Sequence, residues 1–362
     1  MLSARASRRS SRRGARHREG AGVEYGCGKP TRVAGARRPV AAVLAVLLIL
    51  AATGAAQARE RGAPRAPSSS PIVAADQTTR SVLVLDSSRS RWDAEDDDDP
   101  GVLWSWSADR RAGLADLDPG TSWSNPSEVK FRSLGGKRYL LATASGGLAA
   151  VVGYPGREVY WATDTGRGNA HSIELLPDGN VAVAASTGGF VRLYAAATGS
   201  RATRHAQVPL AGAHGVHWDP RTRLLWAVGS RQLVALEAGG EEDDPTLTVV
   251  RRVTLPTRNG HDLAPVLASP GRLWVTTGSA VYQYSTAEQA FVPYALQSRV
   301  SAPGIKSVGD DPRTGQVLVT RPEPGHACSW CTTTLVLYQP DGARTLLRGG
   351  IYKARWWTTA RG

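Results

Sequence analysis

The chain has 362 residues, with 44 Lys and Arg against 31 Asp and Glu, and a formal net charge of +13 at pH 7. A chain of this length can bury a large core without help from disulfides. Residues 1–58 hold 11 of the basic and 2 of the acidic residues, so the rest of the chain is near +4. The positive charge belongs mostly to the N-terminal segment, which removes the main support for nucleic-acid binding.

That N-terminal segment has the pattern of a secretory signal peptide. An Arg-rich stretch precedes the apolar run Val40–Ala52, and Ala56-Gln57-Ala58 matches an A-x-A cleavage site. The apolar run is too short for a membrane span. We therefore expect residues 1–58 to be a signal peptide and residues 59–70 to be a disordered linker rich in Pro, Ser and Arg. The mature protein is predicted to be secreted or extracytoplasmic, with no stable membrane span.

A β-rich unit recurs along the rest of the chain. Its clearest copy, Gly168–Gly199, contains three short strand patterns separated by Pro-Asp-Gly and Ser-Thr-Gly-Gly turns. Similar units start about every 43 to 47 residues, near Ser127, His171, His214, His261 and Lys306. That period, with about four strands in each unit, is typical of the blades of a β-propeller.

The two ends of the chain complete the repeat. Residues 351–357 resemble a sixth first strand with no strands after it. The segments Ile72–Ala75, Ser81–Asp86 and Val102–Ser107 resemble three strands with no first strand before them. We therefore predict an all-β, six-bladed β-propeller over residues 71–359. It is closed by pairing the C-terminal strand with the N-terminal blade, which removes exposed sheet edges.

First strands line the central channel of a propeller, so equivalent positions form a ring. Three of the six His residues that follow residue 58 share one repeat position. Three imidazoles suit a divalent metal with an open coordination position, and two lysines suit an anionic substrate group. Alternatively, each side chain hydrogen-bonds a neighbouring blade or a channel water. The predicted ring consists of Ser127, His171, His214, His261, Lys306 and Lys353.

An insertion near the C-terminus carries a Cys pair. Cys328 and Cys331 form a C-S-W-C sequence within Arg321–Thr332. The pattern is compatible with a thioredoxin-like redox pair or with a local disulfide in an oxidising compartment. The following residues have a strand pattern rather than the helix that such redox pairs open, which favours the disulfide. Trp123 and Trp330 are expected at the same rim of the channel, where an exposed indole would suit sugar stacking.

The ordered motifs HSIELLPDG, GAHGVHWDPRTRLLWAVG, NGHDLAPV, GIKSVGDDPRTGQ and KARWWT resemble an uncharacterised family of secreted bacterial six-bladed propellers, common in actinobacteria. The resemblance spans about residues 72–359 and implies no activity. The His cluster is also similar to that of the oligogalacturonate lyase propellers, in which three His and a Gln hold a divalent metal. That similarity implies a metal held by His171, His214 and His261, with Gln77 as the fourth ligand.

Three functions stay open at this point. The first is a monomeric binding module that captures an anionic small molecule, glycan or cell-wall fragment at the His/Lys ring. The second is a metal-dependent lyase or hydrolase acting on acidic sugars, in which Lys306 or Lys353 polarises a carboxylate or acts as the base. The third is a protein–protein scaffold without ring chemistry. The sequence has no clear nucleophile paired with a general base, which favours binding.

Overall fold

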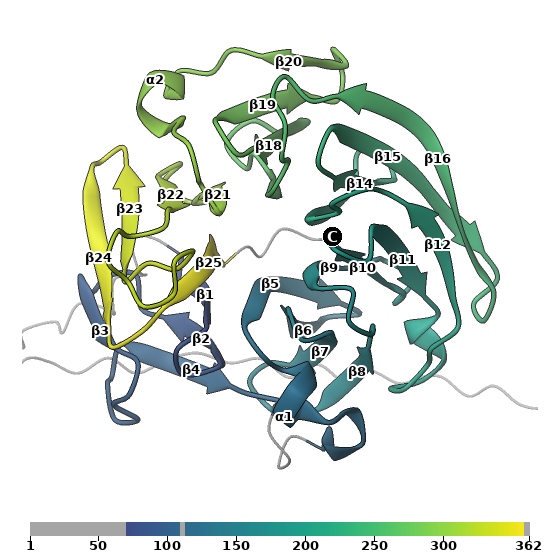
Figure 1. Ribbon diagram of the computed structural model, residues 1–362, viewed down its shortest axis with the longest axis horizontal. Helices are drawn as coiled ribbons and strands as arrows, with labels where there is room; N and C mark the ends of the chain where they lie inside the picture. The colour runs from purple at the N-terminus through teal and green to yellow at the C-terminus, as the bar shows by residue number, and fades with distance from the viewer. Residues whose placement is uncertain (1–69, 109–112, 358–362) are drawn as a thin grey trace, which may run out of the picture. The chain divides into compact units, whose positions relative to one another are not determined.

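The computed structural model describes residues 70–108 and 113–357, so the predicted signal peptide and most of the linker lie outside the described residues. The described chain forms six sheets of four or five strands arranged around a central axis (Figure 1). The predicted six-bladed propeller is therefore confirmed. No helix in the described ranges has the length and apolar character that crossing a membrane requires.

Each blade begins with its innermost strand. Blade 1 consists of β25 (Ile351–Trp356), β1 (Ile72–Asp76), β2 (Ser81–Leu85) and β4 (Val102–Trp106). Blade 2 consists of β5 (Pro126–Leu134), β6 (Lys137–Ala144), β7 (Leu148–Gly153) and β8 (Val159–Asp164). Blade 3 consists of β9 (Ala170–Leu175), β10 (Val181–Ala185), β11 (Phe190–Tyr194) and β12 (His205–Pro209).

The other three blades follow the same order. Blade 4 consists of β13 (Gly215–Asp219), β14 (Leu224–Val228), β15 (Gln232–Gly240) and β16 (Pro245–Thr254). Blade 5 consists of β17 (Leu263–Pro265), β18 (Arg272–Thr276), β19 (Val281–Ser285) and β20 (Ala290–Val292). Blade 6 consists of β21 (Ser307–Asp310), β22 (Val317–Thr320), β23 (Thr334–Tyr338) and β24 (Gly342–Leu347). Short helical turns occur at η2 (Ala115–Leu117), α1 (Pro119–Ser122), η3 (Ala196–Thr198) and α2 (Gln297–Val300).

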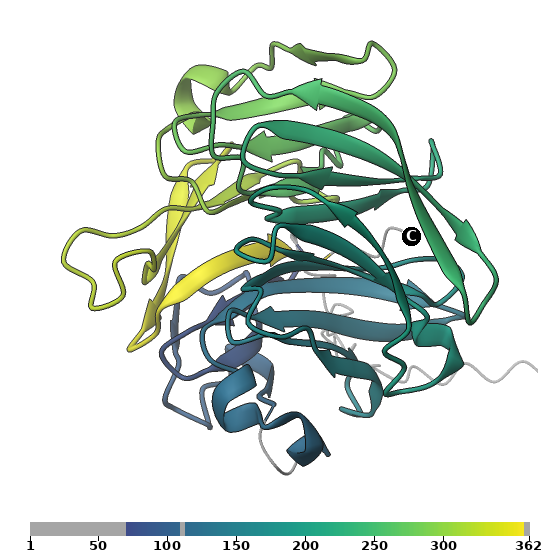
Figure 2. The same ribbon diagram turned by 45° about the vertical axis from the view of Figure 1, so that its right-hand side comes forward.

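The two ends of the propeller meet in blade 1. Strand β25 pairs antiparallel with β1 over most of its length, with Ala354 opposite Ala74 and Trp356 opposite Ile72. Figure 2 shows the yellow β25 beside the blue N-terminal strands. A second link was not predicted from the sequence: β3 (Arg91–Asp93) pairs in parallel with β24, so an N-terminal segment also forms the outer edge of blade 6. The ring is thus closed at two places.

The hydrophobic core lies between the blades. The buried apolar side chains of the described residues group into six clusters, and each cluster joins two adjacent blades. Inner strands are buried on both faces, as in the VAVAA sequence of β10. The outermost strand β16 instead alternates between more and less exposed residues, because one of its faces meets solvent. The packing therefore holds the innermost strands rigidly around the axis.

Candidate functional site

Bulges in the innermost strands set the level of the residues at one mouth of the channel. In blade 3, Ala185 pairs with Ala170 and Ala184 pairs with Ser172, which leaves His171 as an extra residue. A β-bulge of this kind re-aims the side chain that it carries. Ser127 in β5 and Tyr352 in β25 are the extra residues at the equivalent points.

The other three blades have a residue at the same level. The backbone N–H groups of His214, His261 and Lys306 donate to Val228, Thr276 and Thr320, at the start of each innermost strand pair. In blades 4 and 6 the next residue, Gly215 or Ser307, is the first one paired with the second strand. In blade 5 the next residue is Asp262, whose carbonyl accepts from the backbone N–H of Thr276. The resulting set is named the mouth ring, and it consists of Ser127, His171, His214, His261, Lys306 and Tyr352.

The sixth member of this ring is Tyr352, which corrects the prediction of Lys353. The bulge in β25 inserts one residue between Ile351 and Lys353, so the repeat position falls one residue earlier than a count along the sequence suggests. Lys353 lies at the next level of the strand, opposite Ala75, and its side chain is fully buried. It therefore does not face the mouth of the channel.

The three histidines of the mouth ring do come together, as predicted. The imidazoles of His171 and His214 stack with ring centroids 4.5 Å apart and an interplanar angle of 15°. The centroid of His261 lies 4.8 Å from that of His214 and 6.3 Å from that of His171. The rings thus form one group that shares a single space at the mouth of the channel.

A hydrogen bond defines the proton position on one of these rings. The Tyr352 hydroxyl lies 2.9 Å from His261 Nε2. Nδ1 of His261 and Nδ1 of His171 are both buried without a hydrogen-bond partner. His214 Nδ1 donates to the Gly212 carbonyl at 2.7 Å, which leaves Nε2 of His214 as an acceptor.

All three imidazoles are neutral at pH 7. Burial lowers the pKa of His214 to about 4, and Lys353 and Lys306 act in the same direction against the hydrogen bond to Gly212. Burial likewise holds the pKa values of His171 and His261 well below the usual range. Burial also lowers the pKa of Lys306. Lys306 is the lysine of the mouth ring.

Ser127 belongs to the ring by register but makes no contact with the open space. Its side chain is fully buried. Its hydroxyl donates to the Ala170 carbonyl at 2.6 Å and lies 2.9 Å from the Thr143 hydroxyl. The residue predicted as the small, neutral member of the ligand site therefore links blade 2 to blade 3 instead.

The mouth ring forms the floor of a cavity of about 390 Å³, named the mouth pocket. Besides five members of the ring, its lining comprises Gln77, Asn125, Ser145, Asn169 and Trp330. Gln77 was predicted as a site residue, whereas the two asparagines and Tyr352 were not. The pocket combines amide, hydroxyl, imidazole, ammonium and aromatic groups. Such a set is typical of a binding site for a small polar ligand.

The asparagines have a signal in the sequence repeat. Asn125, Asn169 and Asn259 each lie two residues before the ring position of their blade, with φ values of 54°, 59° and 63°. Gly212 and Gly304 hold the same position in blades 4 and 6, also with positive φ. Asn and Gly tolerate this left-handed conformation, which turns the chain into the innermost strand. An Asn or Gly two residues before each ring residue is therefore part of the repeat.

The rim of the pocket carries a fixed tryptophan. Trp330 is 45% exposed, and its Nε1 donates to Gln77 Oε1 at 2.8 Å. Trp330 lies between Cys328 and Cys331, which the structure joins in a disulfide. Trp123, predicted at the same rim, is only 1% exposed, because it packs edge-on against Trp106 inside the core. Trp330 is thus the tryptophan that lines the pocket.

The donor atoms of the three ring histidines do not converge on one point. Among the described residues, one group of His, Cys, Asp and Glu has its donor atoms within 4.8 Å of one another, and it consists of His326, Cys328 and Cys331. The two sulfurs of that group are bonded to each other, so they are not available as thiolate ligands. Stacked imidazoles present their faces to one another, whereas a metal needs nitrogen lone pairs aimed at a common centre.

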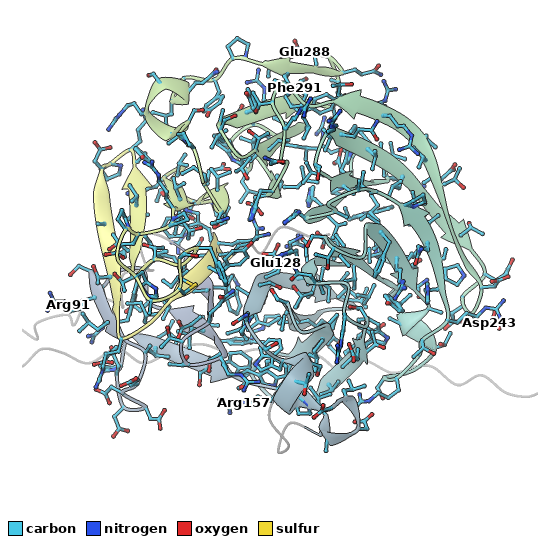
Figure 3. The ribbon with its side chains drawn as sticks, in the orientation of Figure 1. Arg91, Glu128, Arg157, Asp243, Glu288 and Phe291 are labelled. Atoms are coloured by element: carbon cyan, nitrogen blue, oxygen red, sulfur yellow. A yellow bond between two sulfur atoms is a disulfide. The ribbon has the colours of Figure 1, made fainter. Side chains whose placement is uncertain are left out.

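Beneath the mouth pocket, buried charges fill the channel. Lys353 Nζ lies 3.5 Å from Glu128 Oε2 and 3.3 Å from Asp262 Oδ1. Arg355 contacts the same two carboxylates at 2.8 and 2.6 Å. Figure 3 shows Glu128 at the centre of the ring of blades. Two cations balance two carboxylates here. These four residues are named the channel plug. Because they occupy the channel below the mouth pocket, the pocket is a closed-ended site rather than a pore.

The cations of the plug keep its carboxylates ionised. Burial alone would raise the pKa of Glu128, but Arg355 and then Lys353 hold it well below the usual range. Lys353 Nζ also donates to the carbonyls of His171 and His214, at 3.3 and 3.5 Å. The plug therefore supports the histidine backbone from below while its charges stay satisfied among themselves.

Comparison with solved structures finds the same fold at low identity. A protein of unknown function from Bacteroides caccae has 10% identity and a TM-score of 0.50, with 79% of this chain and 98% of that chain covered. Virginiamycin B lyase from Staphylococcus aureus has 10% identity and a TM-score of 0.42, with 62% of this chain and 85% of that chain covered. At this identity the likeness to the Bacteroides caccae protein concerns the fold alone. No curated protein matches the chain. A family profile matches residues 38–360, and the chain therefore belongs to the family described as "Family of unknown function (DUF6528)".

Proposed function

We propose that the protein is an extracytoplasmic binding module that holds a small anionic ligand in the mouth pocket. Lys306 carries this proposal. Its ammonium group lines the pocket and has His261 Nε2, at 3.5 Å, as its hydrogen-bonding contact among the described residues. Lys353, one level below, has two carboxylate partners. A partly buried cation without an anionic partner among the described residues favours an anion from solution.

The neutral groups around Lys306 support the same ligand. The Tyr352 hydroxyl is buried, which raises its pKa and keeps it a hydrogen-bond donor. The low pKa values of the three imidazoles keep further positive charge out of the pocket at pH 7. One cation with several neutral donors and acceptors suits a singly charged polar molecule.

The alternative of a metal-dependent lyase or hydrolase has less support. The three imidazoles stack instead of aiming their nitrogens at one point. The similarity of the His cluster to oligogalacturonate lyases therefore concerns residue type, and the anion-binding function needs no metal. Export is supported by the N-terminal pattern and by the disulfide in the rim insertion, since such bonds persist in oxidising compartments.

Thermal shift with simple anions tests the proposal. Sodium acetate and inorganic phosphate, compared with chloride at equal ionic strength, should raise the melting temperature of the wild type. The variant Lys306→Met should lose this stabilisation. Lys137→Met, at an exposed position at the start of β6, is the matched control and should keep it. Equal stabilisation of the wild type and Lys306→Met by these anions would contradict the proposal. Stoichiometric Zn²⁺ or Mn²⁺ lost in His214→Ala would favour the metal-dependent alternative.

A further inference from the structure

We infer that the ligand of the mouth pocket is a sugar acid, with its ring stacked on Trp330 and its carboxylate at Lys306. This inference rests on the proposed function and names the chemical class of its ligand. Two observations carry it independently of the charge of Lys306. The first is the way in which Trp330 is presented, and the second is the set of polar atoms in the pocket that have no partner.

Trp330 is an exposed aromatic side chain that the protein holds in place. Among the described residues, the exposed large hydrophobic side chains are Leu103, Val250 and Trp330, and only Trp330 lines the mouth pocket. The disulfide flanks it in the chain, and both of its sulfurs lie within 3.6 Å of the same Gln77 Oε1 that accepts the indole N–H.

Gln77 is itself fixed, because its Nε2 donates to the Pro126 carbonyl at 3.1 Å. An indole that is held by a hydrogen bond to a fixed amide and still left open to solvent loses little conformational entropy when a ligand covers it. Its flat apolar face fits a partner that has a flat apolar face of its own and a polar perimeter. The C–H face of a pyranose ring has that shape.

The polar atoms of the pocket are complementary to a ligand that both donates and accepts hydrogen bonds. Asn169 lines the pocket, and its Oδ1 is buried without a partner. His214 Nε2 is a second acceptor, because Nδ1 of that ring carries the proton. A fully ionised inorganic anion or acetate has no hydrogen to offer to either atom. Sugar hydroxyls can donate to both acceptors.

The donors in the pocket complete the match. Lys306 lines the pocket, and its Nζ offers a charge-assisted bond to a carboxylate. A neutral sugar would leave the Lys306 charge unpaired, and acetate would leave the Asn169 and His214 acceptors unpaired. A sugar acid satisfies both kinds of group and adds the stacking surface that Trp330 needs.

Titration of the full chain with three probes tests this inference. Sodium acetate, sodium D-glucuronate and D-glucose are compared by calorimetry or ligand-detected NMR at equal ionic strength. Glucuronate should bind the wild type more tightly than either of the other two. Trp330→Ala should weaken glucuronate binding by roughly three- to tenfold, the range expected for a lost aromatic contact, and should leave acetate binding unchanged.

The variant Trp330→Phe separates stacking from structure. It removes the N–H that donates to Gln77 but keeps an aromatic face, so it should retain most of the glucuronate affinity. Leu103→Ala, which alters an exposed apolar residue of β4 outside the pocket, should change nothing. Lys306→Met should reduce glucuronate binding to the level of glucose. Equal losses in Trp330→Phe and Trp330→Ala would overturn the stacking.

The probes also separate this inference from the proposed function. If acetate binds in a Lys306-dependent way and glucuronate binds no tighter, the sugar-acid inference fails and the anion site stands. If neither probe shows Lys306-dependent binding, both fail. A galacturonate monomer compared with its trimer then distinguishes a free sugar acid from one at the end of a glycan chain, because the trimer gains affinity only if neighbouring sugars also contact the rim.

Discussion

The imidazoles of His171 and His214 lie face to face, with ring centroids 4.5 Å apart and planes 15° from parallel. The two residues belong to consecutive blades, and the sequence repeat brings them to the same level of the channel. Two stacked imidazolium ions at this distance would repel strongly in a buried site. The arrangement therefore requires that at least one of the rings stays neutral, which links the geometry of the pocket to pH.

This link predicts a loss of stability in mild acid. The unfolded chain protonates its histidines near pH 6.5, whereas folded His214 protonates near pH 4. Between these values the unfolded state binds more protons, so the free energy of unfolding falls as the pH drops. The contribution of His214 is at most about 3 kcal/mol and is fully lost below pH 4. Urea unfolding at pH 7.5, 6, 5 and 4.5 measures this change in the free energy of unfolding.

The control for the pH effect is His214→Asn, which cannot titrate and should make the curve shallower between pH 6.5 and 4.5. His171, His217 and His261, whose pKa values burial also lowers, should keep the rest of the slope. Glu128 and Glu174 also have pKa values held below their usual range, after the opposing effect of burial, by Arg355 and by Arg132 respectively. Their contribution is present above the unfolded value of 4.5 and is lost only at lower pH. A wild-type curve that stays flat from pH 7.5 to 4.5 would contradict neutral, buried histidines.

The two lysines near the axis should respond to the same substitution in opposite ways. Lys353→Met leaves Glu128 and Asp262 with Arg355 as their remaining cation in the plug, at a cost of about 3–5 kcal/mol in the free energy of unfolding. Lys306→Met removes a partly desolvated charge that has no carboxylate partner in the described part of the chain, so it should leave stability unchanged or raise it. Denaturant unfolding measures the free energy of unfolding of Lys353→Met and Lys306→Met against the wild type. Equal destabilisation by the two variants would mean that the plug is not the stabilising element.

The difference between these lysines also shows which part of the ring could not be predicted from the sequence. The repeat period and the turn residues predicted the blade count, the closure and the positions of the three ring histidines, because each depends on spacing alone. The bulge at Tyr352 inserts one residue within β25, and only the pairing with β1 reveals it. A count along the sequence therefore chose Lys353, whose ammonium group lies among carboxylates instead of at the pocket.

The rest of the site depends on contacts between distant segments. Glu128 and Asp262 come from different blades, and nothing near either residue in the sequence indicates that they share Lys353 and Arg355. Trp123 and Trp330 have equally plausible positions in the sequence, but only packing decides which one is covered. The Asn or Gly two residues before each ring position is the signal that the sequence did contain, and it leads directly to Asn125 and Asn169.

The closure of the ring predicts that the last strand is required for folding. Deleting residues 351–362 removes β25, its pairing with β1 and the packing of Trp356 and Trp357. The pairing of β3 with β24 is not sufficient to replace it, because it involves only three residue pairs at the outer edge of blade 6. We expect the truncated chain to lose its cooperative thermal transition.

A shorter deletion and a point variant make the same test quantitative. Deleting residues 358–362 keeps β25 and should leave the melting temperature unchanged. Trp356→Ala keeps the backbone pairing but removes a side chain that is 4% exposed and packs between blades 1 and 6, at a cost of about 3–5 kcal/mol. Circular dichroism melts rank the two truncated chains and Trp356→Ala by melting temperature. If the chain without residues 351–362 melts cooperatively at the wild-type temperature, blade 1 does not depend on β25, and the closed ring is not what stabilises the mouth pocket.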